Sequence, residues 1–179
     1  MKKIVIIGAN DFQNQLILKA KEMGFETHVF AWQDGSIGER TADYFYPVSI
    51  VEIDEILEKC KEIKPDAVAT IASDLANITV SKVAAGLGLP GNTPECIEIS
   101  TNKYAMRSAF LKAGIPTPAF YKVDQVQDEL YKMKLPVVVK PTDRSGSRAI
   151  TKITDFKDLE GAIQDAVEQS FEKKAIVEE

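Results

Sequence analysis

Two lysines and a short loop of small residues have the composition of a phosphate-binding site. Residues 137–140 read Val-Val-Val-Lys, so a β-branched strand ends on Lys140 before Pro141 interrupts backbone pairing. The loop that follows contains small turn-forming residues and two arginines: Thr142, Asp143, Arg144, Ser145, Gly146, Ser147 and Arg148. Backbone N–H groups of such a loop can converge on anionic oxygens, while Lys and Arg neutralise their charge. The stretch predicts polyphosphate binding; the alternative is a basic hairpin turn in solvent.

The segments on either side of this loop are the elements that must position it. Upstream, residues 101–103 read Thr-Asn-Lys and begin an amphipathic helix that runs to Ala113. Residues 114–118 contain a glycine and two prolines, which end that helix. Downstream, residues 175–179 read Ala-Ile-Val-Glu-Glu, an apolar strand that closes on two acids. One lysine, Lys103, therefore stands at the start of a helix, and another, Lys140, stands at the end of a strand. The loop of small residues and the acidic strand follow them in that order.

This order of motifs resembles the ATP-grasp ligases, a superfamily that includes biotin carboxylase, carbamoyl phosphate synthetase and the purine-pathway carboxylate-amine ligases. Residues 8–13, Gly-Ala-Asn-Asp-Phe-Gln, are similar to the opening of the domain that precedes the grasp in that superfamily. The resemblance rests on order and spacing, since no single motif is specific. It implies an α/β protein, with an open parallel-sheet, Rossmann-like domain over residues 1–92 and an incomplete α+β ATP-grasp lobe over residues 93–179.

The resemblance also implies which residues contact ATP. Lys103 and Lys140 look like the two lysines that contact the nucleotide phosphates. The loop Ser145, Gly146, Ser147 and Arg148 resembles the flap that folds over those phosphates, and Ala149 stands where relatives often carry glycine, which implies a stiffer flap. Glu178 is similar to the acid that hydrogen-bonds the adenine amino group, and Glu179 falls in the hinge that gives backbone contacts. The alternative for both glutamates is an exposed, charged chain end.

A further implication is that this chain is the N-terminal portion of a longer ligase. The family's second lobe, which carries the magnesium ligands and the residues that act at the acyl phosphate, would follow Glu179. Phosphoryl transfer needs the metal and the positive clamps together, so we expect no turnover by this chain alone. In the parent reaction, ATP would phosphorylate a small carboxylate, and an amine or similar nucleophile would displace the phosphate. The alternative is a non-catalytic module that binds a nucleotide or a metabolite, or that forms a homodimer.

The first half of the chain predicts a parallel sheet with a ligand-binding edge. Apolar runs that read as strands alternate with segments of helical period. The expected strands are 2–7, 26–31 and 67–71, with one short strand within 42–48, and the expected helices are 12–23, 49–63 and 77–86. Residues 33–41 read as a polar loop. Ligands of open α/β sheets bind beyond the carboxyl ends of the strands.

Five residues are predicted to contact the substrate at this edge: Gly8, Asn10, Gln13, Ser73 and Asp74. The alternative for Asp74 is a helix N-cap. Asn10 and Gln13 occupy the second and third glycine positions of a dinucleotide fingerprint, so NAD binding is disfavoured. His28 lies within a strand, which indicates a packed or hydrogen-bonded side chain. In the second half, the expected elements are helices at 94–100, 103–113, 125–133 and 155–170 and strands at 120–123, 137–140, 149–153 and 175–178.

Composition excludes several other classes of protein. The net charge is −5 with acids and bases interspersed, which disfavours nucleic-acid binding. The apolar runs are far shorter than the roughly 20 residues that cross a bilayer, so no membrane association is expected. Cys60 and Cys96 match no metal or redox spacing and indicate reduced thiols in the cytoplasm.

Overall fold

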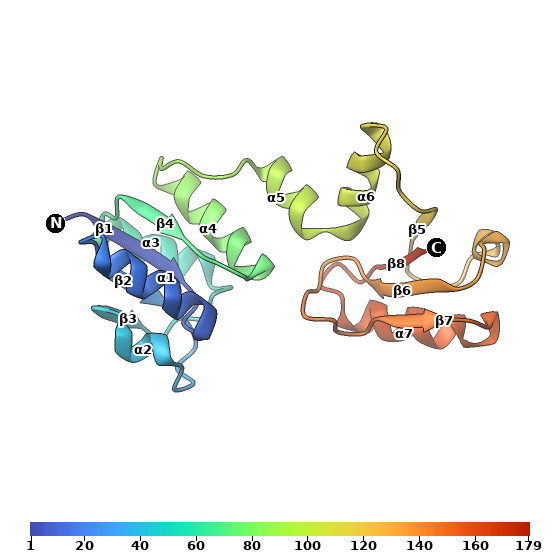
Figure 1. Ribbon diagram of the computed structural model, residues 1–179, viewed down its shortest axis with the longest axis horizontal. Helices are drawn as coiled ribbons and strands as arrows, with labels where there is room; N and C mark the ends of the chain where they lie inside the picture. The colour runs from blue at the N-terminus through green and yellow to red at the C-terminus, as the bar shows by residue number, and fades with distance from the viewer. The chain divides into compact units, whose positions relative to one another are not determined.

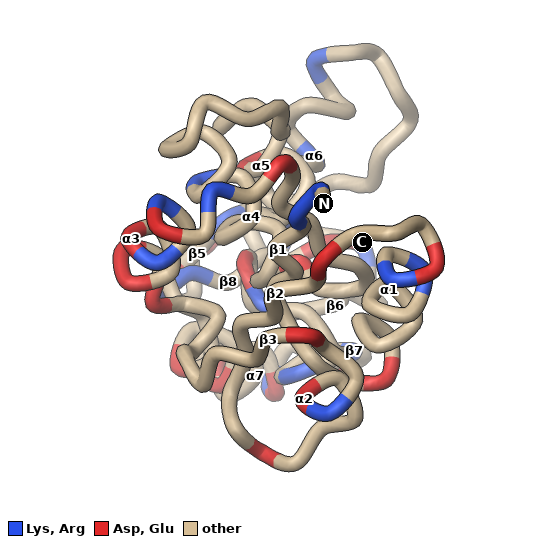
Figure 2. Tube along the Cα trace, turned by 90° about the vertical axis from the view of Figure 1, so that its left-hand side faces the viewer, with Lys and Arg blue, Asp and Glu red and all other residues tan.

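A computed structural model describes residues 1–179, and the chain divides into two compact units, Met1–Ile97 and Glu98–Glu179. Each unit has its own sheet (Figure 1). Both sheets have four strands, and each unit has its own apolar core. The predicted class, a parallel α/β sheet followed by an α+β lobe, is confirmed. Acidic and basic residues are interspersed along the trace (Figure 2). No helix is both long and apolar enough to cross a membrane.

The first unit contains an all-parallel sheet with strand order β3-β2-β1-β4. Its strands are β1 (Lys3–Ile7), β2 (Glu26–Phe30), β3 (Tyr44–Tyr46) and β4 (Ala67–Ala69), and its helices are α1 (Asp11–Glu22), α2 (Ile37–Thr41), α3 (Ile53–Ile63) and α4 (Asp74–Gly86). Successive residues of β1 point to opposite faces, so Val5 and Ile7 join one core layer and Ile4 and Ile6 join another. Both faces are therefore buried, which explains why β1 reads as a continuous apolar run.

Sequence reasoning missed α2, because residues 33–41 were expected to be a polar loop. Gly38 within this helix lies against the loop after β1: its N–H donates to the carbonyl of Ala9 at 3.0 Å. A Cβ built on Gly38 would lie 2.6 Å from that carbonyl oxygen and 2.9 Å from the Ala9 Cα. The contact depends on glycine because both opposing atoms are backbone and cannot rotate away.

Replacing Gly38 by alanine is expected to lower the free energy of unfolding by about 1 to 3 kcal/mol, the usual cost of overpacking. Gly161 is the matched control, because it lies in an exposed helical turn of the second unit with nothing within 4 Å of a built Cβ. Gly161→Ala should instead stabilise by about 0.5 to 1 kcal/mol, since alanine loses less backbone entropy in a helix. Guanidinium unfolding of both variants measures the difference, and the same sign for both would contradict the packing described.

The second unit contains an antiparallel sheet with strand order β5-β8-β6-β7. Its strands are β5 (Phe120–Val123), β6 (Val137–Pro141), β7 (Thr151–Ile153) and β8 (Ala175–Glu178). Helix α7 (Leu159–Gln169) covers one face of this sheet (Figure 1). On that face, Leu159 and Ile163 pack in one core with Val139 and Val177. Because side chains alternate along a strand, Lys140 and Glu178 lie on the opposite face of the sheet.

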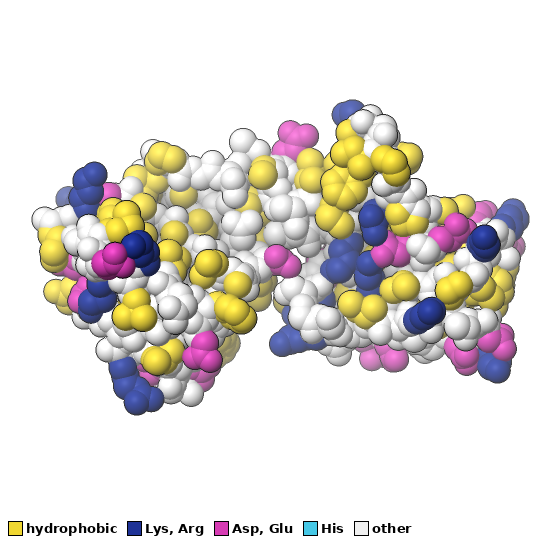
Figure 3. Space-filling view, in the orientation of Figure 1, with side chains coloured by type: hydrophobic (Ala, Val, Ile, Leu, Met, Phe, Trp, Pro, Cys, Tyr) yellow, Lys and Arg dark blue, Asp and Glu magenta, His cyan; other side chains and the backbone are white.

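Two helices precede this sheet, α5 (Pro94–Thr101) and α6 (Lys103–Lys112). The side chain of Asn102 caps α6 by accepting hydrogen bonds from the N–H groups of Tyr104 and Ala105, at 3.0 and 3.1 Å. No side chain of α6 is fully buried, and apolar side chains gather over this helix in Figure 3. The predicted helix start, and with it the position of Lys103 in the first turn, is confirmed.

Three expected elements of the second half were wrong in type or extent. Residues 125–133 do not form an α-helix; only Asp128–Lys132 forms a 3-10 turn, which places Leu130 in the core. The helix expected from Asp155 begins with a 3-10 turn, so α7 starts at Leu159. The return strand expected at 149–153 is limited to β7, because Ala149 has φ 49°, a left-handed conformation that a strand excludes.

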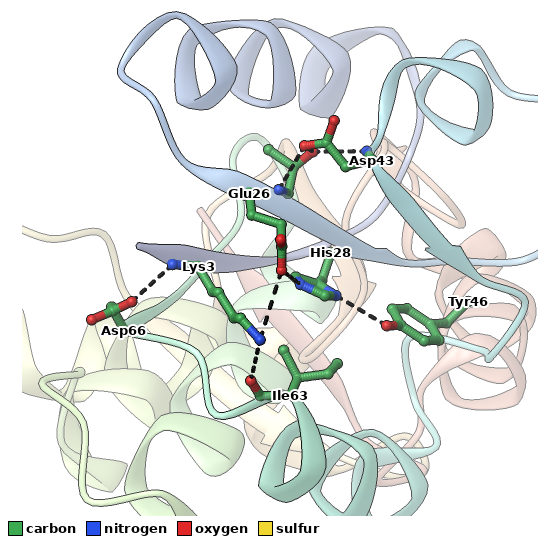
Figure 4. A network of polar contacts seen from close by, with 8 residues as sticks. Lys3, Glu26, His28, Asp43, Tyr46, Ile63 and Asp66 are labelled. Atoms are coloured by element: carbon green, nitrogen blue, oxygen red, sulfur yellow. Dashed lines mark hydrogen bonds and ion pairs between the residues drawn. The ribbon is translucent and has the colours of Figure 1, made fainter. Parts of the chain in front are cut away.

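His28 is confirmed as a packed, hydrogen-bonded residue of β2 (Figure 4). Its side chain is buried, with Nδ1 3.0 Å from the Tyr46 hydroxyl and Nε2 2.8 Å from Glu26 Oε1. Lys3 Nζ lies 3.7 Å from the same carboxylate oxygen. The network therefore joins β1, β2 and β3, and both ring nitrogens are engaged within it.

The two cysteines are both free thiols, as expected from their spacing. Cys60 is buried in the core of the first unit, and Cys96 is exposed. Burial raises the pKa of Cys60 to about 12, so this thiol is protonated at neutral pH and acts as a packing residue.

Candidate functional site

The carboxylate of Glu178 lies between two cations on the sheet face that α7 leaves uncovered. Arg107 Nε donates to Glu178 Oε2 at 2.9 Å, and Lys140 Nζ contacts Glu178 Oε1. The three side chains are 8% (Glu178), 17% (Lys140) and 22% (Arg107) exposed. Basic and acidic side chains meet below α6 in Figure 3. The cluster is thus a partly buried ion triad with one more positive than negative charge.

The ionisation of Glu178 follows from these contacts. Burial opposes the charged form, but the hydrogen bonds from Arg107 and Lys140 outweigh it, so the pKa of Glu178 lies below its usual value of 4.5. Glu178 is therefore a carboxylate at neutral pH and accepts hydrogen bonds without donating any.

Strand register explains why Lys140 and Glu178 meet. In the antiparallel pair of β6 and β8, Lys140 is opposite Ile176 and Glu178 is opposite Val138. Lys140 and Glu178 are therefore diagonal neighbours on one face, within reach of a long side chain. Arg107 comes from a different element, α6, one turn after Lys103, so both cations project from the same face of that helix.

Lys103 is attached to the base of the predicted flap. Its N–H donates to the carbonyl of Thr142 at 2.7 Å, and its Nζ contacts the carbonyl of Arg144. Asp143 accepts from the N–H groups of Phe171 and Glu172, at 3.1 and 2.7 Å. The Arg144 guanidinium also lies 4.3 Å from the centre of the Phe171 ring. The structure therefore brings Lys103 and Lys140 to the same loop and fixes the base of that loop.

The tip of the flap is held less firmly than its base. Residues Ser145, Gly146, Ser147 and Arg148 are all exposed. Gly146 and Ser147 have φ angles of 74° and 56°, and Ala149 has 49°. Two residues with a Cβ thus adopt a left-handed conformation that costs about 1 kcal/mol each relative to the right-handed one. The turn at the tip is therefore formed by the local backbone conformation of these residues, whose side chains are exposed to solvent.

The two terminal acids have different surroundings. Glu178 is buried, so it is not the exposed charged chain end that was its alternative. Glu179 is exposed; its N–H donates to the carbonyl of Ala119 at 3.1 Å, and its carboxylate accepts from the N–H of Lys134 at 2.7 Å. Only Glu178 belongs to the ion triad. Its contact with a nucleotide base, like the hinge role of Glu179, stays a prediction.

In the first unit, the predicted substrate residues lie where strands β1 and β4 end. Asn10 caps α1 by accepting from the N–H of Phe12 at 2.9 Å, and Gln13 is buried with its amide against the carbonyl of Ile71. Ser73, not Asp74, is the N-cap of α4, accepting from Ala76 N–H at 3.2 Å. The capping alternative for Asp74 was therefore wrong, because the cap lies one residue earlier.

Gly8 has φ 101°, and its N–H donates to the carbonyl of Phe30 at 2.8 Å. A Cβ built on this glycine would lie 3.0 Å from the Gln13 side chain. The conformation and the close packing explain the glycine without a ligand. Asp74 is exposed in the first turn of α4. Among the five predicted substrate residues, it is therefore the one whose side chain neither caps a helix nor packs in the core.

Sequence reasoning missed two features of these sites. Arg107 was not singled out, although its position four residues after Lys103 on a predicted helix places the two on one face. Three exposed apolar side chains each follow the carboxyl end of a strand: Phe12, Trp32 and Ile71. The polar substrate residues were predicted from the same position at the strand ends. The described residues include no group of three or more His, Cys, Asp or Glu side chains placed to hold a metal ion.

Comparisons with known proteins find relatives over nearly the whole chain. No protein-family model matches the chain. Formate-dependent phosphoribosylglycinamide formyltransferase of Prochlorococcus marinus is 23% identical over 174 residues, which cover 94% of this chain and 44% of that protein. Carbamoyl phosphate synthase large chain of Mycobacterium sp. is 28% identical over 171 residues, which cover 88% of this chain and 15% of that protein.

Solved structures also match the fold of nearly the whole chain. The crystal structure of L-amino acid ligase from Bacillus licheniformis matches with a TM-score of 0.81 at 23% identity, over 99% of this chain and 44% of that one. The chain therefore spans less than half the length of each of these three proteins.

Proposed function

The chain is homologous over nearly its whole length to ATP-grasp ligases, and from this relationship we propose that it is the N-terminal portion of an ATP-dependent carboxylate-amine ligase that works through an acyl phosphate. In this proposal the second unit supplies half of the nucleotide site. The first unit supplies part of the pocket for a small carboxylate, at the edge where Asp74 is exposed.

One observation supports nucleotide binding above the others: Lys140, Glu178 and the helix that begins at Lys103 meet on one sheet face beside the flap. A triphosphate carries several negative charges and accepts hydrogen bonds only. Lysine suits it as a mobile point charge, and the flap can add backbone N–H groups. The ionised Glu178 suits the exocyclic amino group of adenine, which donates hydrogen bonds.

We propose roles for the chain's residues in the reaction. Lys103 and Lys140 would neutralise and orient the ATP phosphates, and Ser145, Gly146, Ser147 and Arg148 would close over them and exclude water. The described residues contain no group of three or more His, Cys, Asp or Glu side chains that could hold a metal ion. We therefore assign the magnesium ligands to the second lobe of the family. Transfer of the phosphoryl group to the carboxylate would depend on that lobe.

The location and oligomeric state are also proposals. We place the protein in the cytoplasm, as expected for an ATP-consuming metabolic enzyme with two free thiols. A homodimer is the assembly to test first, because the biotin carboxylase domain of Hydrogenobacter thermophilus 2-oxoglutarate carboxylase, whose structure is similar to this chain, is described as a dimer.

Calorimetry with Mg-ATP tests the proposal. Lys140→Ala is expected to weaken binding by about 1 to 3 kcal/mol, because it removes a charged donor to phosphate. Lys157→Ala is the control: Lys157 is exposed on the 3-10 turn Phe156–Asp158 before α7 and pairs only with nearby Asp155. Equal loss in both variants would show a non-specific effect of charge. Absence of binding by both this chain and a version extended through the reading frame beyond Glu179 would refute the ligase assignment.

A further inference from the structure

Arg107 is a charged side chain of the candidate nucleotide site that the sequence motifs do not mark. It donates from Nε to Glu178 Oε2 at 2.9 Å, while Lys140 contacts the other carboxylate oxygen. Arg107 comes from α6, whereas Lys140 and Glu178 come from paired strands. The carboxylate is therefore held from two directions by elements that differ in sequence and in type.

The direct contact between Lys140 and Glu178 conflicts with their separate roles in nucleotide binding. In the proposed function, Lys140 binds phosphate and Glu178 binds the base, and these groups lie on opposite sides of the ribose. Lys140 must therefore leave Glu178, at least in part, when ATP binds. If Lys140 were the only cation, its departure would leave the charge of a partly buried carboxylate removed from water without compensation, which is strongly disfavoured.

We propose that Arg107 is a positioning residue that keeps the Glu178 carboxylate ionised and oriented after phosphate draws Lys140 away, so that the site selects adenine over guanine. The inference rests on the proposed function, since it concerns the same nucleotide site. An ionised carboxylate accepts from the adenine amino group and repels the guanine carbonyl oxygen at the equivalent place. A protonated carboxyl group can donate to that carbonyl and would lose the selection.

The surroundings of Glu178 give Arg107 this role. The charged groups that contact the carboxylate are Arg107 from α6 and Lys140 from β6. The residues paired with Glu178 across the sheet, Phe120 on β5 and Val138 on β6, are apolar. Both cations lower the pKa of Glu178 against the effect of burial, so the departure of Lys140 leaves Arg107 as the group that opposes burial. A guanidinium stays charged at any physiological pH and holds a fixed donor geometry.

Binding of ATP, GTP and inorganic tripolyphosphate to wild type, Arg107→Met and Arg107→Lys tests the inference. Lys112→Met is the matched control, because it removes one positive charge from the exposed last turn of the same helix. Arg107→Met is expected to weaken ATP binding about tenfold relative to this control, the effect of one charge-assisted hydrogen bond. Tripolyphosphate binding should equal that of the control, and the preference for ATP over GTP should shrink. Arg107→Lys should recover most of the preference.

The pH profile provides the readout that a loss of folding would not mimic. With Arg107 present, Glu178 stays ionised between about pH 5.5 and 8, so any change in ATP affinity over this range should match the change in tripolyphosphate affinity, which reflects titration of the phosphates themselves. In Arg107→Met the pKa of Glu178 should rise, so ATP affinity should increase with pH more steeply than tripolyphosphate affinity does, as the carboxyl group ionises. Carbon-13 NMR of Glu178 in the ligand-free protein would measure the same rise directly.

The outcomes separate this inference from the proposed function. If wild type binds ATP but Arg107→Met keeps the ATP preference and the wild-type pH profile, the inference alone is overturned. Equal weakening of ATP and tripolyphosphate beyond the control would also overturn it, because Arg107 would then act on phosphate. Failure of the wild-type chain and its extended form to bind any nucleotide would overturn the proposed function, and the inference with it.

Discussion

Replacing Glu178 by glutamine is expected to lower the free energy of unfolding by about 2 to 3 kcal/mol at neutral pH, somewhat less than the cost of breaking a fully buried ion pair. The substitution keeps the size and shape of the side chain but leaves Arg107 and Lys140 facing each other without the intervening carboxylate. Both cations are mostly buried, so solvent replaces only part of the lost interaction. Urea unfolding of wild type and variant would measure the difference.

The pH dependence of this difference has a definite sign. The pKa of Glu178 is lowered in the folded protein, so its stabilising contribution is complete above the unfolded value of about 4.5 and is lost as the pH falls through the lower folded value. Wild type and Glu178→Gln should therefore converge in stability under acid conditions. Glu168→Gln, an exposed position on α7, is the control and should differ from wild type by less than about 0.5 kcal/mol. A pH-independent difference for Glu178→Gln would contradict a role for the charge of Glu178.

Replacing Phe30 by alanine is expected to destabilise the first unit by about 3 to 5 kcal/mol. Phe30 is fully buried at the end of β2, and its ring stacks on Tyr46 with 4.6 Å between centroids. Removal of the ring deletes apolar burial and leaves a cavity that the surrounding strands cannot close. Because Trp32, the only tryptophan, lies two residues away, its fluorescence during guanidinium unfolding would follow this unit.

Phe12→Ala is the matched control for this core substitution. Phe12 has the same side chain in the same unit but is 65% exposed at the start of α1. Its replacement should change the unfolding free energy by less than about 0.5 kcal/mol. Similar losses for the two phenylalanines would contradict the assignment of Phe30 to the core.

The strands of this protein were largely predictable from the sequence. β1, β6 and β8 are short apolar runs with clear boundaries, and the buried positions of these strands require such runs. The start of α6 was also predictable, because Asn102 has the side chain and position of an N-cap. These signals are local, so a single sequence is enough to find them.

Other features depend on contacts that a sequence does not display. The 3-10 turn at Asp128–Lys132 has the apolar spacing of a helix, but Leu130 and Met133 are drawn into a core built mostly by later residues. Helix α2 depends on the approach of Gly38 to Ala9, far away in the chain. The hydrogen bond of Arg107 to Glu178 forms only because β8 places Glu178 beside α6. Each of these outcomes was decided by tertiary packing rather than by local preference.

The strand order of the second unit has a consequence for folding during synthesis. β8 comes last in sequence among its strands but pairs with both β5 and β6, so it occupies the interior of the sheet. While a ribosome is still translating residues 124–174, β5 has no partner and one side of β6 is open. The first unit lacks this delay, because its last strand, β4, joins at an edge. We therefore expect nascent chains to complete the first sheet well before the second, and to expose unpaired strand edges to chaperones in the interval.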